Sequence, residues 1–240
     1  MRLTIMQDCF GKPPLLNAKA AMETRMKAFF FAVLGVLMTM GLIVVDAGDG
    51  VAEPSAASRT DVGAVERVAN RAEAAFADRV RRLQPASALY FLDLLRTGPK
   101  ARLSARLEDG SVVTMGENAE LAIDEFVYAP GETRAITLRS LKGALLFIGE
   151  KLFGGDSEVR IRTPVAILGV RGTEVWVGPI DGATGVLVLD GEVSVGSGKG
   201  VVILGPGEGT MIGDDGSLSA PKTWGQGKVE RALAMVALGD

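Results

Sequence analysis

Short blocks of valine, isoleucine and leucine fill the chain from Leu89 onward and restrict the folds that it can adopt. Within the blocks, apolar residues alternate with polar ones or form runs too short for a helix. Turn dipeptides such as Asp109-Gly110, Pro130-Gly131 and Asp181-Gly182 separate them. No helical segments alternate with these strands, which argues against a parallel α/β sheet. The pattern predicts a mainly β fold: an antiparallel or irregular β-roll, a sandwich, or a short β-solenoid of many short strands.

Two helices are expected to flank the β region. Residues 60–84 carry apolar side chains at spacings of three and four, with charged residues on the remaining face, and Pro85 follows them. This predicts one N-terminal amphipathic helix, which would dock on its own domain rather than on a partner. Near the other end, Val229, Leu233 and Val236 share one helical face. Residues 213–240 are therefore predicted to form a C-terminal hairpin and a short helix.

The N-terminal part reads as a targeting segment. Residues 28–45 form an apolar run with basic residues before it and acidic residues after it, a charge pattern that directs the following chain out of the cytoplasm. Residues 1–52 are therefore expected to be a signal peptide, or a membrane anchor if they are not cleaved. Met22 and Met26 both offer alternative starts, and with a start at Met26 residues 1–25 are not translated. Residues 53–59 read as a small-residue linker.

Composition removes several kinds of chemistry. The chain has 240 residues and no histidine, and its one cysteine, Cys9, lies near the N-terminus. A Ser-His-Asp or Cys-His arrangement cannot form, and the body of the protein cannot hold a zinc ion on histidine or cysteine. The formal net charge of −3 gives no strong basic field for nucleic acid. We therefore expect a protein that is not an enzyme, with no catalytic, cofactor-binding or metal-binding residues.

Arg171 is the most distinctive side chain of the β region, because it stands inside an otherwise apolar run. A partly buried guanidinium must find acceptors, or its desolvation costs several kcal/mol. Asp190 and Glu192 lie on a neighbouring apolar block, so the sequence predicts an ion pair between Arg171 and one of them. The alternative is an exposed Arg171 that contacts an anionic ligand. Gly172 would let the backbone turn or approach another segment closely.

Three strings of this region resemble the core signature of the FecR domain: TPVAILGVRGTEVWV (163–177), VLVLDGEVSV (186–195) and VVILGPGEG (201–209). Three upstream strings resemble the N-terminal half of the same domain: LDLLRTG (92–98), LEDGS (107–111) and LAID (121–124). The resemblance covers roughly residues 88–212. We interpret the residues of the signature as mainly structural: Thr163, Pro164, Gly169, Arg171, Gly172, Thr173, Asp190, Gly191 and Glu192.

The resemblance implies a function without catalysis. The family takes its name from the periplasmic sensor half of a ferric citrate regulator. By resemblance, this chain is an exported interaction, sensory or adaptor module of the bacterial periplasm. It would bind envelope proteins by strand addition or surface contact, and would meet the membrane only through an uncleaved N-terminal segment. We find no counterpart of the regulator's sigma-factor-binding segment or of its further periplasmic sequence. We therefore expect a stand-alone module, and we carry over neither sigma-factor regulation nor iron uptake.

Two other functions stay open at this stage. A cell-wall or exopolysaccharide-binding protein would need exposed aromatic side chains, and aromatic residues make up 5% of the chain. Trp176 and Trp224 are the only tryptophans, and each is either a core residue or an exposed recognition anchor. A hydrolase could work through two carboxylates alone. Acidic residues are scattered along the chain, however, and no pair stands out.

Overall fold

The computed structural model describes residues 59–129, 133–149 and 156–239. The apolar run at 28–45, Cys9 and nearly all of the 53–59 linker lie outside these residues. In the described part, no helix has the length and apolar character needed to cross a bilayer.

The described chain is mainly β, as the sequence predicts. Its first strands are β1 (Asp61–Ala69), β2 (Ala72–Phe76), β3 (Arg79–Arg82), β4 (Ala88–Tyr90), β5 (Leu94–Thr97), β6 (Arg102–Leu107), β7 (Val112–Met115) and β8 (Glu120–Ala129). Its later strands are β9 (Thr133–Lys142), β10 (Leu145–Ile148), β11 (Asp156–Arg162), β12 (Ile167–Ile180), β13 (Ala183–Ser197), β14 (Gly200–Leu204), β15 (Glu208–Ile212) and β16 (Lys222–Thr223). The helix α2 (Gln226–Ala234) follows.

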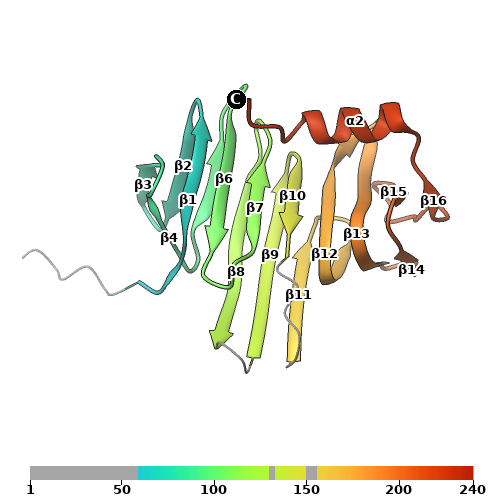
Figure 1. Cartoon of the computed structure of the whole chain (residues 1–240), viewed down its shortest axis with the longest axis horizontal. Helices are drawn as coiled ribbons and strands as arrows, with labels where there is room; N and C mark the ends of the chain where they lie inside the picture. The colour runs from blue at the N-terminus through green and yellow to red at the C-terminus, as the bar shows by residue number, and fades with distance from the viewer. Residues whose placement is uncertain (1–58, 130–132, 150–155, 240) are drawn as a thin grey trace, which may run out of the picture. The chain divides into compact units, whose positions relative to one another are not determined.

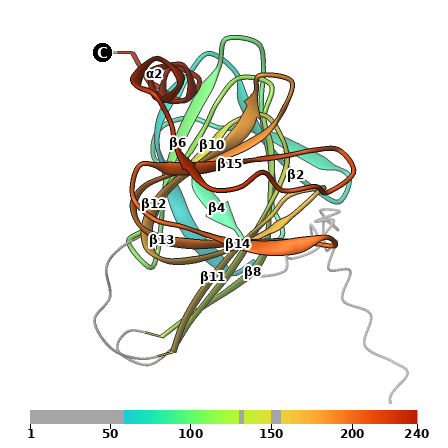
Figure 2. The same ribbon diagram turned by 90° about the vertical axis from the view of Figure 1, so that its right-hand side faces the viewer.

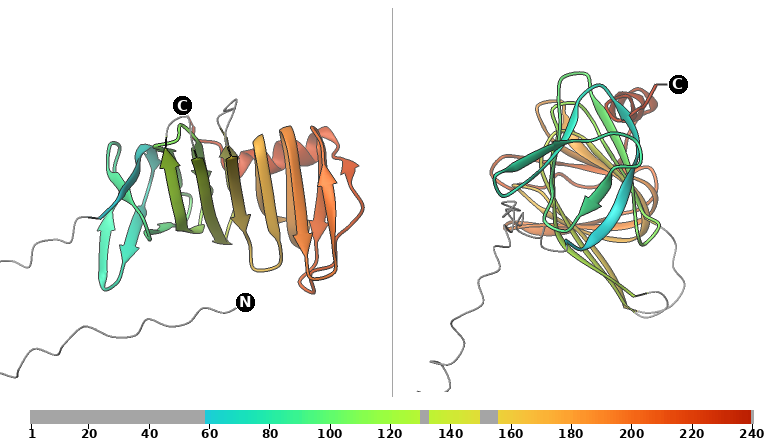
Figure 3. Two further views of the ribbon diagram at one scale, coloured as in Figure 1. Left: turned by 90° about the horizontal axis from the view of Figure 1, so that it is seen from below. Right: turned by 90° about the vertical axis from the view of Figure 1, so that its left-hand side faces the viewer.

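All the strands belong to one sheet, which curls around an apolar core. Its main path runs β3-β2-β5-β8-β9-β11-β12-β10-β7-β6-β1-β4, and β13 joins β14 and β15 to β12. Strands lie side by side in a row in Figures 1 and 3, and Figure 2 looks along that row at the curled sheet. All pairs are antiparallel except β9 with β11. Mainly antiparallel pairing suits a chain in which short turns join short strands.

Residues 60–84 form β1, β2 and β3, so the predicted amphipathic helix is wrong. The error has a local cause. A bulge interrupts β1 between Val65 and Arg67, and turns at Asn70 and Ala77, both with positive φ, separate the three strands. Each interruption shifts the alternation of buried and exposed residues. The shifted alternation imitates a helical spacing over the whole segment, and pairing with other strands overrides the helical preference of its alanines.

One large cluster of buried apolar residues, most of them aliphatic, runs from Val62 in β1 to Ile212 in β15 and holds the sheet together. A second cluster lies under α2 and contains Trp176 and Trp224, which are 0% and 5% exposed. Their rings meet edge to face with centroids 6.1 Å apart. Both tryptophans are therefore core residues, and neither is an exposed anchor.

The predicted short C-terminal helix is present as α2, which lies across the ends of β10, β12 and β13 (Figure 1). Its buried contacts come from Ala232, with Val236 just beyond its last turn. A turn at residues 213–217, closed by a hydrogen bond from Gly213 N–H to the Ser217 carbonyl, precedes it.

Candidate interaction surface at the signature turns

Thr163 and Pro164 form a tight turn between β11 and β12. The Thr163 Oγ1 accepts a hydrogen bond from the Ala166 backbone N–H at 3.0 Å and lies 3.1 Å from the Ala166 carbonyl, to which it donates. The Thr163 N–H also donates to that carbonyl, at 2.8 Å. Proline fits inside the turn because it has no N–H to satisfy. The Thr163 hydroxyl therefore holds the turn closed.

The residues around Gly172 and Gly191 form a corner in the two longest strands. Arg171 pairs with Glu192 and Glu174 pairs with Asp190, so two residues of β12 oppose the single Gly191 of β13. This is a β-bulge, and it bends both strands. Before the bulge β12 pairs with β11, and after it β12 pairs with β10. The corner therefore carries the two strands from one side of the curled sheet to the other.

Both corner glycines adopt the left-handed backbone conformation that favours glycine, with φ of 58° at Gly172 and 84° at Gly191. A Cβ added to Gly191 would lie 2.3 Å from the Thr173 Cγ2 and 2.9 Å from the Gly172 carbonyl oxygen. Thr173 is buried, and among the described residues its Oγ1 has no hydrogen-bond partner. The glycines thus permit a close approach of two backbones.

Arg171 is exposed, so the expectation of a partly buried guanidinium is wrong. The alternation along β12 turns its side chain outward, while Val170 and Thr173 point into the core. Glu192 lies directly opposite Arg171 in the β12–β13 register, as expected of a neighbouring strand. No ion pair between Arg171 and Glu192 is seen in the described part of the chain, however. An exposed guanidinium has no desolvation penalty to offset, which removes the reason for the pair.

Beside the Thr163 turn lies a cavity of about 630 Å³. Turns and strand ends from several places in the chain line it, among them residues 117–118, 140–144, 163–165 and 177–179. Two cations and two carboxylates border it together with apolar side chains: Arg102, Lys142, Glu117 and Asp214, with Leu141 and Met235. The cavity can therefore offer charge of either sign beside apolar surface.

Two smaller cavities adjoin this one and extend it into a groove. One, of about 460 Å³, shares Pro179 and Asp214 with it, and the other, of about 270 Å³, shares Asn118 and Lys142. The smaller one is lined by charges that alternate in sign across four neighbouring strands: Glu73 of β2, Arg96 of β5, Glu120 of β8 and Lys142 of β9. We call the three cavities together the turn groove.

Asp181, in the β12–β13 turn, fixes α2 beside the turn groove. Its carboxylate lies 3.0 Å from the Lys228 Nζ and 2.8 Å from the Arg231 Nη2. The hydrogen bond from Lys228, helped by the charges of Lys228 and Arg231, holds the pKa of Asp181 below its ordinary value of 3.8. Lys228 also lies over the Trp224 ring, 4.2 Å from its centroid.

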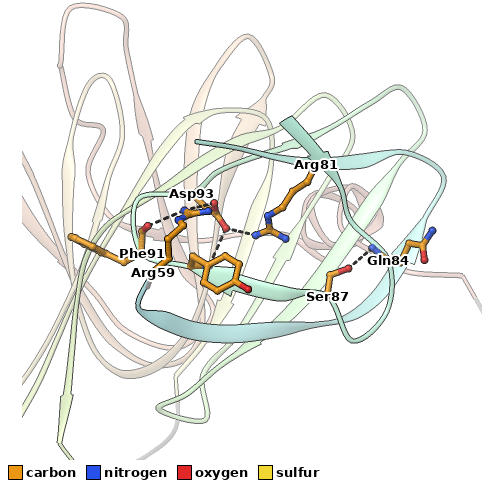
Figure 4. A network of polar contacts seen from close by, with 7 residues as sticks. Arg59, Arg81, Gln84, Ser87, Phe91 and Asp93 are labelled. Carbon is orange, nitrogen blue, oxygen red and sulfur yellow. Dashed lines mark hydrogen bonds and ion pairs between the residues drawn. The ribbon is translucent and has the colours of Figure 1, made fainter. Parts of the chain in front are cut away.

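Asp93 organises a polar network at the N-terminal end of the domain (Figure 4). Its side chain is fully buried, and its carboxylate accepts hydrogen bonds from Arg59 at 2.7 Å, from the Tyr90 N–H at 2.9 Å, and from Arg81. The Arg59 guanidinium also stacks over the Phe76 ring, 3.9 Å from its centroid. A buried carboxylate with these partners is a structural anchor of β2, β3 and β5.

In residues 59–239, outside the two gaps, no three side chains of histidine, cysteine, aspartate or glutamate gather as metal ligands would. Two exposed carboxylates, Asp181 and Asp215, have lowered pKa values, and each is bonded to a lysine.

Comparison with known proteins agrees with the signature. Residues 93–194 match the family model described as FecR protein. This segment is similar to the FecR domain. It begins at Asp93 of the buried network and ends at Ser194 of β13, so the Thr163 turn, the corner and much of the turn groove belong to it.

Two crystal structures resemble the chain that carries this FecR domain. Both are of a protein from Parabacteroides distasonis that is provisionally described as an anti-sigma factor. One has a TM-score of 0.48 and 21% identity, covering 60% of this chain and 65% of the other. The second has a TM-score of 0.47 and 21% identity, covering 58% and 64%. The chain thus spans less than two thirds of either relative. No curated protein matches the sequence.

The structure separates the signature residues into three places. Arg171, Gly172 and Thr173 meet Asp190, Gly191 and Glu192 at the corner. Thr163 and Pro164 line the turn groove instead. Gly169 lies on the outer face of β12, where an added Cβ would come 2.6 Å from the Ser194 Oγ. Sequence reasoning did not show that Glu117 and Asp214, which lie far apart along the chain, line one groove.

Proposed function

We propose that this chain is an exported, non-enzymatic sensory or adaptor protein whose FecR domain binds another protein of the bacterial envelope at the turn groove. The observation that carries the proposal is the position of the FecR signature. Thr163 and Pro164 border a groove that is large enough for side chains of a partner and offers both signs of charge. Charged groups arranged in this way give specificity and fast association.

A protein ligand suits the lining better than a glycan. Sugars are usually held by exposed aromatic rings, and the lining of the main cavity contains none among its described residues. Leu141, Pro164, Pro179 and Met235 instead offer apolar contact area between the charged positions. A polypeptide can satisfy both kinds of surface, with apolar side chains at the centre and charged ones at the rim.

Export to the periplasm is supported by the sequence around the apolar run at 28–45. Arg25 and Lys27 precede it, and Asp46 and Asp49 follow it. Positive charges before an apolar segment keep its start in the cytoplasm, so the FecR domain would be released on the other side. The proposal holds whether the run is cleaved or remains as an anchor.

Photo-crosslinking of the full chain in cells tests the binding site. A photoreactive amino acid is placed at Leu141, which lines the groove and is 37% exposed, or at Ile148, which is 39% exposed and lies outside it. The expected result is one discrete protein adduct from Leu141 that is absent from Ile148, identified by mass spectrometry. The charge reversal Lys142→Glu should remove this adduct. Equal adducts from both positions, or none from Leu141, would contradict the proposal.

A further inference from the structure

Four strands of the described sheet pair on one side only, β3, β4, β14 and β16, and β3 and β14 differ in how their open edges are protected. β3 pairs only with β2 and β14 pairs only with β13, so each leaves one edge without strand pairing in the part of the chain that the structure describes. β3 has the sequence Arg-Val-Arg-Arg, and charged residues discourage pairing with another strand. β14 has the sequence Gly-Val-Val-Ile-Leu and carries no charge. It lies at the other end of the row of strands (Figures 1 and 2).

The hairpin geometry determines which β14 groups face outward. Ser197 and Gly200 flank a two-residue turn, so they form its closing hydrogen-bonded pair. Hydrogen-bonded and non-hydrogen-bonded pairs then alternate along the hairpin. Val201 and Ile203 fall at non-hydrogen-bonded positions, opposite Gly196 and Ser194. Their N–H and C=O groups therefore point away from β13, toward the open edge.

The same two residues expose apolar side chains. Val201 is 68% exposed and Ile203 is 60% exposed. Their cross-strand neighbours Gly196 and Ser194 are small, and Ile167 of β12, which pairs with Gly196, is 49% exposed on the same face. An uncharged edge thus borders an apolar patch, the combination that favours addition of another strand.

We propose that β14 is a self-association edge, at which β14 of one copy pairs antiparallel with β14 of a second copy about a twofold axis through Val202. In this register Val201 of each copy lies opposite Ile203 of the other. Val201 and Ile203, whose backbone N–H and C=O groups face outward, then each pair with the other residue in the second copy. The two hydrogen-bonded pairs contain four hydrogen bonds in all. The β-branched side chains of each pair meet across the new ladder, where such pairs are stabilising.

Charge complementarity favours a second copy over an unrelated strand. In the twofold register Lys199 lies opposite Gly205 of the second copy. The Gly205 N–H donates to the Glu208 Oε2 at 2.8 Å, which holds that carboxylate beside the position where Lys199 would arrive. Each end of the dimer would therefore bring Lys199 of one copy, which pairs with Asp215 of its own copy, beside Glu208 of the other. Because a five-residue edge buries little area, the dimer belongs to the weak class of interfaces.

Sedimentation of the purified full chain in a mild detergent tests the proposal over a range of concentrations. The wild type is expected to associate reversibly. Ile203→Lys should weaken the dimer by at least about tenfold, because it places like charges at both ends of the new ladder. Val80→Lys is the matched control, since Val80 is also 60% exposed and also lies on an edge strand. A monomeric wild type, or equal effects of the two lysines, would overturn the proposal.

Disulfide trapping tests the register separately. With Cys9 replaced by serine, Val202→Cys should form a covalent dimer under mild oxidation, because the twofold axis places the two Val202 residues opposite each other in a non-hydrogen-bonded pair. Val201→Cys should crosslink much more slowly, since its counterpart is Ile203. Equal rates would overturn the twofold register.

A photoreactive group at Val201 that captures a different protein and not a second copy would assign β14 to a partner strand. Neither result affects the test at Leu141.

Discussion

At the scale of single residues, Gly191 is the position where the corner between β12 and β13 tolerates least change. Gly191→Ala would force a left-handed backbone on alanine and bring its Cβ within 2.3 Å of the Thr173 Cγ2. Strain and overpacking together should lower the free energy of unfolding by about 2–4 kcal/mol, measured by chemical denaturation. Gly182→Ala separates the two causes, because Gly182 has φ of 81° but nothing within 4 Å of the added Cβ. Equal losses in both variants would contradict the close approach at the corner.

Asp93 is the second residue whose replacement has a defined cost. Asp93→Ala would remove a buried carboxylate and leave the guanidiniums of Arg59 and Arg81 without their acceptor. The expected loss of stability is about 2–3 kcal/mol, below the value for a fully buried pair because the arginine side chains are 23% and 33% exposed. Asp124→Ala, which breaks the exposed pair with Arg139, should change stability by less than about 0.5 kcal/mol. Thermal unfolding of both variants makes the comparison.

At the scale of elements, the attachment of α2 should depend on acid pH through Asp181. Because the bond to Lys228 lowers the pKa of Asp181 in the folded protein, its stabilising effect is complete above the ordinary value of 3.8. The effect is lost as pH falls from 3.8 through the lower folded pKa. Acidification should therefore loosen α2 and change the fluorescence of Trp224, whose ring contacts Lys228.

Two variants assign this acid transition. Asp181→Asn should remove the part of the fluorescence change that α2 contributes. The contact between the asparagine side chain and Lys228 no longer depends on pH in this range. Asp215→Asn is the control: hydrogen bonding from Lys199 also lowers the pKa of Asp215, but that pair does not touch α2. An unchanged transition in Asp181→Asn would show that another group controls the helix.

The elements also show which parts of the fold could be predicted from sequence. Strands after Leu89 and the helix α2 follow from local patterns of apolar residues and turns, so the mainly β architecture was predicted correctly. The strands in residues 60–84 were not predicted. The bulge in β1 and the turn at Asn70 shift the alternation of buried and exposed residues in ways that local spacing cannot reveal. The turn groove depends on which turns come together in the curled sheet, and strand pairing between distant segments decides this.

At the scale of the whole molecule, the single aliphatic cluster from β1 to β15 makes the described domain one cooperative unit. Asp93 and Gly191 lie far apart in the strand order, yet their variants should lower the same single unfolding transition. Circular dichroism of the strands and fluorescence of the buried tryptophans should report coincident midpoints in each variant. Separate midpoints in Gly191→Ala would divide the domain into two folding units, with the second around Trp176 and Trp224.

We predict that the apolar run at 28–45 carries this domain across a membrane. A phosphatase that is active only outside the cytoplasm, fused after Asp240, should be active in cells that express the full chain. Replacing Val33 and Leu37 by arginine should abolish the activity, because each arginine in the middle of an apolar segment costs about 2.5–3.5 kcal/mol of insertion free energy. Arginine at the exposed position Val80 should leave the activity unchanged. An inactive fusion of the unmodified chain, at normal protein levels, would place the FecR domain in the cytoplasm and exclude an envelope partner.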